Sequence, residues 1–289
     1  MAEITITKAV VPAAGRGTRL LPATRSQPKE MLPIGRKPTI QHVVEELAAA
    51  GLREVLLISG QDKRALEDHL DRGVVKGEHH EPWMDLHFFH ARQSAPRGLA
   101  DAIALAEPFT AGEPFVVALG DSVILSKEQQ PLLRRMMAVH AARRPAATIA
   151  VETVPREAVS RYGIVAAKEP VDAPFAISDI VEKPKPEEAP SNLSAAGRYL
   201  LDAAVFAAIR QIEPGVGGEL WLTDALRVLL QEGKEIVCVP LAASEHRLDI
   251  GNFQSYFQAF IELSFRDPEY GAAVQEWAQK LLRREEHSH

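Results

Sequence analysis

Glycine and basic side chains crowd the segment AAGRGTRLLPATRSQPKEMLPIGRKP at residues 13–38. The glycines are Gly15 and Gly17, and the cationic residues include Arg16, Arg19, Arg25 and Lys29. Glycine lets backbone N–H groups approach an anion closely, and a guanidinium group holds phosphate oxygens in a planar fork. The composition of this segment therefore predicts a phosphate-binding site.

The spacing in this segment excludes two common phosphate-binding motifs. A P-loop would close on Gly-Lys-Ser/Thr, and a dinucleotide-binding fingerprint would need a third glycine where Leu20 stands. Pro22, Pro28 and Pro33 stiffen the chain around the cations, because proline fixes the backbone angle φ. Rigid placement of several cations favours a catalytic site over a solvated turn.

Two aspartates follow predicted strands and are candidate metal ligands. Asp121 comes directly after the strand PFVVALG, and Asp249 lies near the end of the strand HRLDIG. Ligands bind at the carboxyl ends of strands in open α/β sheets, and two carboxylates with phosphate oxygens and water suit an octahedral Mg²⁺. We therefore expect Mg²⁺ as the cofactor, bound by Asp121 and Asp249. An ordinary turn aspartate is the alternative interpretation of either residue.

The first half of the chain alternates short apolar runs with helical stretches. Buried strands are expected at 8–12, 54–59, 86–91 and 114–120, and helices at 39–50, 62–70 and 98–106. Such alternation is typical of βαβ units, whose strands form a mainly parallel sheet with helices on its faces. The loops after Val11, Ser59 and Leu119 then mark the edge of the sheet where a ligand crevice is expected.

After residue 145 the predicted strands follow one another closely. They are expected at 146–154, 162–169, 176–184, 195–201, 235–241 and 246–251, with helices at 202–212, 219–232 and 253–265. The aromatic residues within 253–260 have helical spacing and are expected in the core. Tyr270, Val274, Trp277 and Leu281 predict a last amphipathic helix, which packs on its own domain or on a partner subunit.

Length and composition exclude several classes of protein. The 289 residues are 46% hydrophobic, which excludes a disordered chain and suffices for one large α/β domain or two packed units. The net charge of −6 gives no reason to expect nucleic acid or an anionic membrane as a partner. The sequence shows no secretory signal and no run near the roughly 18 apolar residues of a membrane helix, so we expect a cytoplasmic protein. The single cysteine, Cys238, is expected to act as a small hydrophobe.

Beyond these local patterns, the chain resembles the sugar-phosphate nucleotidylyltransferases. The segment PATRSQPKEMLPIGRKPTIQHVVEE is similar to that of bacterial UTP–glucose-1-phosphate uridylyltransferases. Further motifs of this family follow in order: RQSAPRGLADAI, VVALGDS, SRYGIV, VEKPKPEEAPSN, GRYLL, GGELWLTDAL and RLDIG. The resemblance implies a Rossmann-like α/β nucleotidyltransferase fold, with a mixed, mainly parallel sheet flanked by helices and a smaller sugar-binding β subregion. It divides the chain into a nucleotide-binding half at 1–145, a sugar-phosphate-binding half of the same domain at 146–252, and C-terminal helices at 253–289.

The resemblance implies Mg²⁺-dependent transfer of a uridylyl group from UTP to glucose 1-phosphate, giving UDP-glucose and pyrophosphate. By resemblance Arg19 clamps the triphosphate, Lys29 stabilises the transition state and Lys183 holds the sugar phosphate. A phosphate monoester has a second pKa near 6, so the nucleophile is already largely dianionic at neutral pH and needs no general base. The site must then align anions and neutralise charge on the transferring group.

The same resemblance assigns residues to the nucleotide and to the sugar. The nucleotide-binding residues are Ala14, Gly15, Gly17, Gln93 and Gly98, and the sugar-phosphate-binding residues are Gly163, Glu182 and Lys183. An amide side chain such as that of Gln93 offers both a donor and an acceptor, as the edge of a pyrimidine requires.

At several positions the chain departs from the family pattern. The departures are Ala100 and Asp101 in place of Gly and His, Ser122 in place of an acidic residue or Asn, Trp221 in place of Gln, and a shortened stretch between Asp71 and Gln93. Two alternatives follow. One is a thymidylyltransferase that uses dTTP, and the other is a catalytically silent regulatory protein that binds nucleotide sugars. The family also implies a homo-oligomer, either a dimer or a tetramer.

Overall fold

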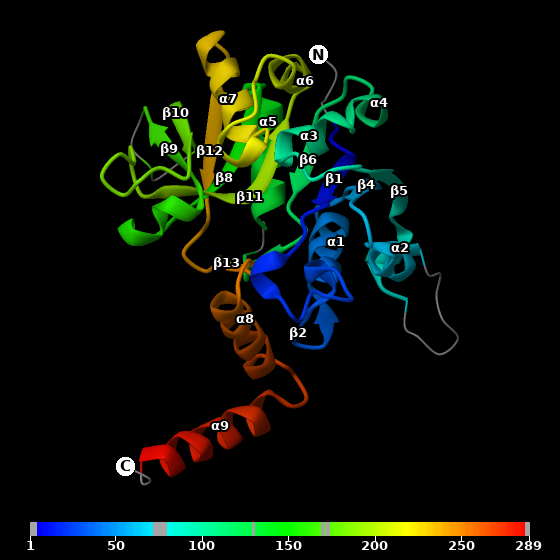
Figure 1. The fold of residues 1–289 in the computed structure, drawn as a ribbon, viewed down its shortest axis with the longest axis vertical. Coiled ribbons are helices and arrows are strands. Elements are labelled where there is room, and N and C mark those ends of the chain that lie inside the picture. The colour runs from blue at the N-terminus through cyan, green and yellow to red at the C-terminus, as the bar shows by residue number, and fades with distance from the viewer. Residues whose placement is uncertain (1–4, 72–79, 129–130, 169–170, 172–173, 287–289) are drawn as a thin grey trace.

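A nine-stranded sheet runs through the molecule, and helices cover both of its faces (Figure 1). The structure is a computed structural model that describes residues 5–71, 80–128, 131–168, 171 and 174–286. Part of the shortened stretch between Asp71 and Gln93, residues 72–79, lies outside the described residues. The strand order is β5-β4-β1-β6-β11-β8-β12-β10-β9, and two small sheets pair β13 with β7 and β2 with β3.

The strands lie close to the positions that the sequence predicts. They are β1 Lys8–Ala13, β2 Pro33–Ile34, β3 Lys37–Pro38, β4 Glu54–Ser59, β5 His87–Arg92, β6 Phe115–Ala118, β7 Ser122–Leu125, β8 Ala147–Thr153, β9 Gly163–Ala167, β10 Phe175–Glu182, β11 Leu193–Leu201, β12 Ile236–Pro240 and β13 His246–Asp249. The short strands β2, β3 and β7 were not predicted.

The helices also follow the predicted order, with additions. They are α1 Thr39–Ala50, α2 Arg64–Asp71, α3 Leu99–Ala104, α4 Glu107–Thr110, α5 Leu132–Arg143, α6 Ala204–Ile209, α7 Leu222–Gln231, α8 Phe253–Phe265 and α9 Gly271–Glu286. Sequence patterns missed α4 and α5. In α5 the buried residues Leu132, Leu133 and Met136 have helical spacing, so a signal for this helix was present.

The sheet is parallel in its first half and mixed in its second. Strands β5, β4, β1 and β6 are parallel neighbours, as the βαβ pattern predicts. Beyond β6, only the pair β8 and β12 is parallel, and β11, β10 and β9 pair antiparallel with their neighbours. The prediction of a mainly parallel sheet is therefore wrong for the second half, because closely spaced strands there lack the helical crossovers that parallel pairing needs.

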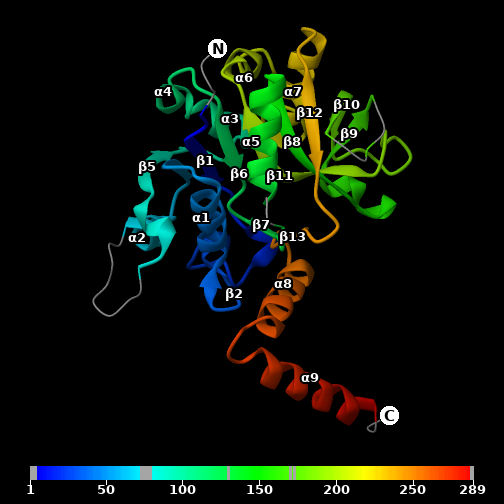
Figure 2. The same cartoon turned by 180° about the vertical axis from the view of Figure 1, so that it is seen from behind.

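Two apolar layers fill the space between the sheet and its helices. One cluster joins the inward faces of α1, α2 and α5 to the sheet, and the other joins α3, α6 and α7 to its opposite face (Figures 1 and 2). Strand β1 contributes to both, since Val11 faces the first cluster and Val10 the second. Cys238 on β12 is fully buried in the second cluster, which confirms its role as a small hydrophobe.

The carboxyl ends of β1 and β4 lie level with each other. Ala13 pairs with Ser59, and the backbone N–H of Gln93 after β5 donates to the carbonyl of Ser59 at 2.9 Å. Gly60 permits this packing, because a Cβ atom there would lie 2.8 Å from the carbonyl oxygen of Ala14. The loops after β1 and β4 therefore meet at one edge of the sheet, as predicted, and the loop after β5, which was not predicted, joins them there.

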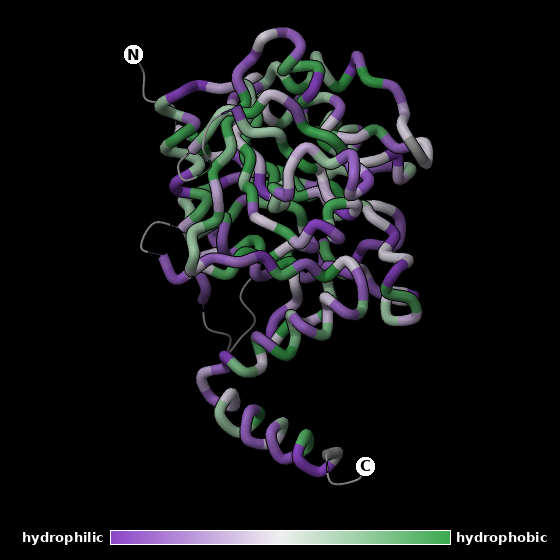
Figure 3. The backbone as a smooth tube through the Cα atoms, turned by 90° about the vertical axis from the view of Figure 1, so that its left-hand side faces the viewer, coloured by the Kyte–Doolittle hydropathy of each residue, from purple (hydrophilic) through white to green (hydrophobic). Residues whose placement is uncertain are grey.

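The C-terminal helices extend away from this body (Figure 3). Ala259 of α8 is buried, whereas Phe257 is 55% and Phe260 38% exposed. The prediction that the aromatic residues of this helix belong to the core is therefore wrong for these two, because only one side of α8 faces the body. On α9 the side chain of Trp277 is 62% exposed, so this helix does not bury its apolar side on its own domain. None of the described helices combines the length and the apolar character needed to cross a membrane.

Candidate active site

Three adjoining cavities follow the carboxyl edge of the sheet. The first, of about 500 Å³, lies between the loops at 14–16, 24–28, 60–63 and 93–96. The second, of about 320 Å³, shares Ala14, Gln93 and Pro96 with the first. The third, of about 220 Å³, shares Leu99, Leu119, Asp121 and Lys183 with the second. Together they form one cleft, and Asp121 and Lys183 lie where its second and third cavities meet.

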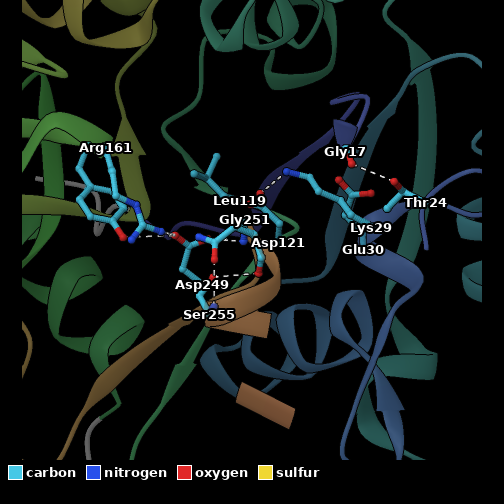
Figure 4. Close-up of polar contacts among 12 residues, drawn as sticks. Gly17, Thr24, Lys29, Glu30, Leu119, Asp121, Arg161, Asp249, Gly251 and Ser255 are labelled. Carbon is cyan, nitrogen blue, oxygen red and sulfur yellow. Dashed lines mark hydrogen bonds and ion pairs between the residues drawn. The ribbon is translucent and has the colours of Figure 1, made fainter. Parts of the chain in front are cut away.

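The glycine-rich loop after β1 forms one wall of the first cavity. Gly17 adopts a φ of +64°, and its carbonyl accepts a hydrogen bond of 2.8 Å from the hydroxyl of Thr24 (Figure 4). This bond folds the loop back, so that Arg16 and Arg25 both line the cavity. Neither arginine has an ion-pair partner among the described residues. Gly17 itself packs against Thr24 and Lys29, so its contribution is to the shape of the loop.

Lys29 forms an ion pair with Asp121 across the second cavity (Figure 4). Its ammonium donates to Oδ2 of Asp121, and both side chains are largely buried, with 16% and 23% exposed. Burial disfavours the charged form of Lys29, but the carboxylates of Asp121 and Glu30 outweigh it and raise its pKa. Burial likewise opposes ionisation of Asp121, and the attraction of Lys29 outweighs it and lowers the pKa of that carboxyl. Both groups are therefore charged at neutral pH.

A second buried ion pair supports the first. Lys63 donates to Oε2 of Glu30 at 2.8 Å, and these side chains are only 7% and 2% exposed. Burial raises the pKa of Glu30, and the nearby ammonium groups of Lys63 and Lys29 oppose that rise. Sequence patterns missed both residues. Glu30 could have been predicted, because it directly follows Lys29 in the sequence. Lys63 comes from a different loop, and no sequence pattern marks it as a site residue.

Asp249 lies beside Asp121 because β13 pairs with β7. In this register Asp249 faces Ser122, and the backbone N–H of Ile250 donates to the carbonyl of Asp121 at 3.2 Å. Oδ1 of Asp249 accepts from the N–H of Gly251 at 2.8 Å, and Oδ2 accepts from the hydroxyl of Tyr162 at 3.3 Å. Figure 4 shows both aspartates in this region, with Arg161 reaching Asp249 at 3.8 Å.

The chemistry of these donors fits Mg²⁺. Both aspartates line the third cavity, and carboxylate oxygen is the ligand that this hard cation prefers. The described residues contain no group of three or more His, Cys, Asp or Glu side chains that could hold a metal ion. Asp121 and Asp249 would therefore share an ion with water and with oxygens of a bound ligand, as is usual for Mg²⁺.

The third cavity is lined by side chains that bind one another. Glu182 accepts from the hydroxyl of Thr223 at 3.1 Å through Oε2 and pairs with Lys183 at 3.1 Å through Oε1. The ammonium of Lys183 also lies 5.5 Å from the centre of the Trp221 ring, within the range of a cation–π contact. At Gly163 a Cβ atom would lie 2.8 Å from Thr223, so glycine is needed for this close packing.

The backbone holds Lys183 in an uncommon conformation. Its φ is +45°, which non-glycine residues rarely adopt, and its N–H donates to the carbonyl of Tyr162 at 2.9 Å. Residues in such conformations cluster at active sites. Arg19 lines this third cavity too, rather than the first. Sequence patterns missed Tyr162, Thr223 and Arg247 as lining residues, because each comes from a separate element.

Gln93 lines both the first and the second cavity with its amide group already oriented. Its Nε2 donates to the carbonyl of Gly98 at 3.1 Å and to Asp101 at 2.7 Å. The amide oxygen is thus left to accept from a ligand. Gly98 has a φ of +101°, and a Cβ atom there would lie 2.4 Å from the carbonyl oxygen of Leu220, so no other residue fits. Asp101, one of the departures from the family pattern, therefore orients Gln93.

Comparisons with known proteins give the family and the fold of the chain. The sequence profile described as "Nucleotidyl transferase" matches residues 8–264. The chain is 40% identical to a UTP–glucose-1-phosphate uridylyltransferase of Bacillus subtilis (strain 168) over 293 residues, which covers 97% of each protein. A crystal structure of a UDP-glucose pyrophosphorylase in complex with UDP-glucose matches with a TM-score of 0.82 and 36% identity, covering 89% of this chain and 97% of the other. A UTP-bound UGPase from Acinetobacter baumannii matches with a TM-score of 0.82 and 30% identity, covering 96% and 99%.

Proposed function

The chain belongs to the nucleotidyl transferase family, and from this premise we propose that it is a UTP–glucose-1-phosphate uridylyltransferase. A phosphate oxygen of glucose 1-phosphate forms a bond to the α-phosphorus of UTP. The bond from that phosphorus to the oxygen bridging to the β-phosphate breaks, and pyrophosphate leaves with the electron pair. UDP-glucose is the second product.

One observation supports this proposal above the others. Asp121 and Lys183 line both the second and the third cavity, and Lys29 pairs with Asp121 at the same place. A nucleotide that extends from the first cavity and a sugar phosphate in the third would therefore bring their phosphates together beside three charged groups. Bringing two anions into line is the main task in this reaction, because the nucleophile needs no deprotonation at neutral pH.

The cations act at different stages of the proposed reaction. Lys29 is rigidly held and stabilises negative charge that develops on the α-phosphate, since a preorganised donor needs no rearrangement in the transition state. Lys183, oriented by Glu182 and by the Trp221 ring, holds the phosphate of glucose 1-phosphate. Arg19 is exposed and lines the third cavity, from which we propose that it closes on the phosphates of UTP.

Mg²⁺ is the proposed cofactor, and Asp121 and Asp249 are its proposed protein ligands. The ion would neutralise charge on the phosphates and help to align them. The chain itself contributes the placement of the two carboxylates: the pairing of β7 with β13 fixes their backbones, and hydrogen bonds from Gly251 and Tyr162 fix the Asp249 carboxylate.

Base recognition is proposed at the meeting of the first and second cavities. The backbone of Ala14 and Gly15 and the amide oxygen of Gln93 are available to a pyrimidine there, with Gly17 and Gly98 shaping the walls. The N3–H group of uracil suits the free oxygen of Gln93. Thymine carries the same group, so this contact does not separate the two bases. We propose UTP because the similar proteins named above act on UTP or UDP-glucose.

A silent regulatory protein on this fold is less consistent with the site. Such a protein needs only to bind the product. The paired charges of Lys29 and Asp121, buried at considerable desolvation cost, suit differential stabilisation of a transition state. The proposal therefore retains catalysis.

The rest of the proposal concerns organisation. Residues 1–145 would bind the nucleotide and residues 146–252 the sugar phosphate, within one continuous sheet. The C-terminal helices would join two copies of the chain, because Phe257, Ile261 and Trp277 present exposed apolar surface that a second copy would cover. Analytical ultracentrifugation tests this, since a monomer at micromolar concentration would exclude it. A cytoplasmic location is part of the same proposal.

The proposed reaction can be tested by identifying its products. We expect the purified protein with UTP, glucose 1-phosphate and Mg²⁺ to yield UDP-glucose and pyrophosphate in equal amounts, measured by phosphorus NMR. The reverse reaction from UDP-glucose and pyrophosphate should also proceed. Binding of UDP-glucose without turnover in either direction would support the silent alternative instead.

A further inference from the structure

Arg198 on β11 is a fully buried arginine behind the turn that carries Asp121. Its side chain is 0% exposed, and it heads the largest fully buried side chains of the described residues. A charged group is costly to bury unless it is paired and hydrogen-bonded. The partner is Glu46 on α1, whose Oε2 accepts from NH2 of Arg198 at 2.7 Å and from Nε at 3.1 Å. The other carboxylate oxygen, Oε1, has no hydrogen-bond partner among the described residues.

The remaining donors of Arg198 reach the backbone around Asp121. NH2 donates to the carbonyl of Ser122 at 2.8 Å, and NH1 donates to the carbonyl of Gly197 at 3.2 Å. NH1 also makes a long contact of 3.5 Å with the carbonyl of Leu119. Leu119 and Ser122 are the two ends of the turn that carries Asp121, so one guanidinium group touches the turn on both sides of that carboxylate.

Strand β11 presses on the same turn through its backbone. The carbonyl of Gly197 accepts from the N–H of Leu119 at 3.0 Å, and the register of β11 with β8 shifts between Ala195 and Tyr199. Gly197 has a φ of +77°, and a Cβ atom there would lie 3.1 Å from the hydroxyl oxygen of Ser122. The register shift in β11 thus brings the strand into contact with the turn, and the Arg198 side chain reaches the carbonyls of Leu119 and Ser122.

The turn is therefore held from two directions. After β13, the backbone N–H of Ile250 donates to the carbonyl of Asp121 at 3.2 Å. On the buried side, Arg198 holds the carbonyl of Ser122. With both anchors in place the Asp121 carboxylate has a fixed base from which to meet Lys29.

We propose that Arg198, held by Glu46, is a positioning residue that fixes the backbone of Asp121 for catalysis. The inference rests on the proposed function, in which Asp121 takes part in uridylyl transfer. An apolar pair of similar volume would often serve stability as well as a buried ion pair does. The guanidinium group is planar and has five donors, so it can bind a carboxylate and two or three carbonyls at once. Its hydrogen bonds are directional and fix the orientation of those carbonyls, which an apolar pair cannot do.

Replacement of Arg198 by lysine tests the proposal. Lysine keeps the charge, but all its donors are on one nitrogen atom. It therefore cannot form the same hydrogen bonds to the Glu46 carboxylate and to the Ser122 carbonyl. We expect R198K to lower kcat by about 10²-fold, the effect of a displacement near 1 Å at a reacting group. KM for UTP should stay within about threefold, because the first cavity is unchanged. Backbone amide hydrogen exchange should become faster at residues 119–123.

A matched control separates positioning from stability. Arg135 on α5 donates at 2.7 Å to Glu245, and their side chains are 24% and 0% exposed, so R135K disturbs another arginine–glutamate pair with one fully buried partner. We expect R135K to lower the free energy of unfolding. Its kcat and its backbone amide hydrogen exchange at residues 119–123 should stay unchanged. If R198K does not fold, E46Q provides the second variant, because it keeps the shape of Glu46 and removes its charge. E46Q should show the same changes in smaller measure.

The outcomes separate this inference from the proposed function. A folded R198K, or E46Q in its place, with kcat and exchange at 119–123 equal to those of R135K overturns the positioning role. Wild-type protein that makes no UDP-glucose rejects the proposed function. In that case the exchange measurement still decides whether Arg198 fixes the turn.

Discussion

In the third cavity most charged side chains bind one another, whereas in the first cavity two arginines face open space. Glu182 accepts from Thr223 and pairs with Lys183, and nearby Arg247 pairs with Glu152 at 2.5 Å. By contrast, Arg16 and Arg25 line the larger first cavity without an ion-pair partner among the described residues. Both sets lie along one cleft, so the difference concerns how their geometry is fixed.

From this difference we infer that the two regions serve different parts of the proposed reaction. Side chains that are already held by the protein need no rearrangement when charge develops, so they suit the chemical step. Unpaired cations on a loop gain their partner only when a phosphate arrives, so they suit binding. Substitutions near Asp121 should therefore act mainly on kcat, and substitutions in the first cavity mainly on KM.

The largest effect is expected for Asp121→Asn. The amide keeps the shape but removes the anion that pairs with Lys29 and that Mg²⁺ prefers, so kcat should fall by about 10³-fold or more. Steady-state turnover over a range of Mg²⁺ concentrations measures this. The control is Asp68→Asn on the exposed side of α2, which should leave turnover unchanged. An Asp121 variant with normal turnover and normal Mg²⁺ dependence would place the metal elsewhere.

Lys29→Ala should follow, with a loss of about 10² to 10³ in kcat and little change in binding of UDP-glucose. The raised pKa of Lys29 keeps its ammonium protonated up to and beyond the ordinary pKa of a lysine, so wild-type kcat should show no loss from this group between pH 7 and 9. Isothermal titration with UDP-glucose measures binding separately. Lys37→Ala, which breaks a lysine–glutamate pair outside the cleft, is the control. Turnover within a few-fold of wild type would refute the role of Lys29.

Lys183→Ala should be less severe and of a different kind. The phosphate of glucose 1-phosphate is charged before the reaction, so the loss should raise KM for this substrate as well as lower kcat. A hydrogen bond to a charged group is worth roughly 1.5–3 kcal/mol, which corresponds to about 10- to 10²-fold in kcat/KM. Lys185→Ala, two residues further on and exposed, should have no effect. An unchanged KM for glucose 1-phosphate would move that phosphate away from Lys183.

The smallest effect is expected in the open region, for Arg16→Ala. An exposed cation is screened by water, so KM for UTP should rise only about two- to fivefold while kcat stays unchanged. The difference should shrink as salt is added. Kinetics at low and high ionic strength check this, with Arg53→Ala as an exposed control. A large fall in kcat would contradict the inference that the first cavity serves substrate binding and the region near Asp121 serves the chemical step.

Local patterns predicted most of the strands and helices and the first part of the site. The strand β1, the glycine-rich loop after it and Lys29 are contiguous, so their order alone places cations at the end of a strand. The position of Asp121 after β6 followed in the same way. Helix α1 was predicted to the residue, since its apolar spacing runs from Thr39 to Ala50 without interruption.

Contacts between distant segments could not be predicted in this way. Lys63 and Glu30 meet because two loops pack together, and Arg198 meets Glu46 across 152 residues. The antiparallel insertion of β11 between β6 and β8 was missed for the same reason, since strand pairing leaves no local mark on a fully buried strand. The exposed face of α8 was missed because periodicity locates an apolar face and does not say what covers it.

The most direct test of the account is pyrophosphate release with UTP, dTTP, ATP and GTP, each paired with glucose 1-phosphate and Mg²⁺. Uracil and thymine differ by one methyl group, which is worth about 1–3 kcal/mol in a fitted pocket, so kcat/KM for UTP should exceed that for dTTP by at least about tenfold. Turnover with ATP and GTP should be lower still, because adenine has no ring N–H to donate to the Gln93 oxygen and guanine is larger than the uracil that the pocket is proposed to hold. Equal or better use of dTTP, or no pyrophosphate with any of the four, would contradict a UTP–glucose-1-phosphate uridylyltransferase.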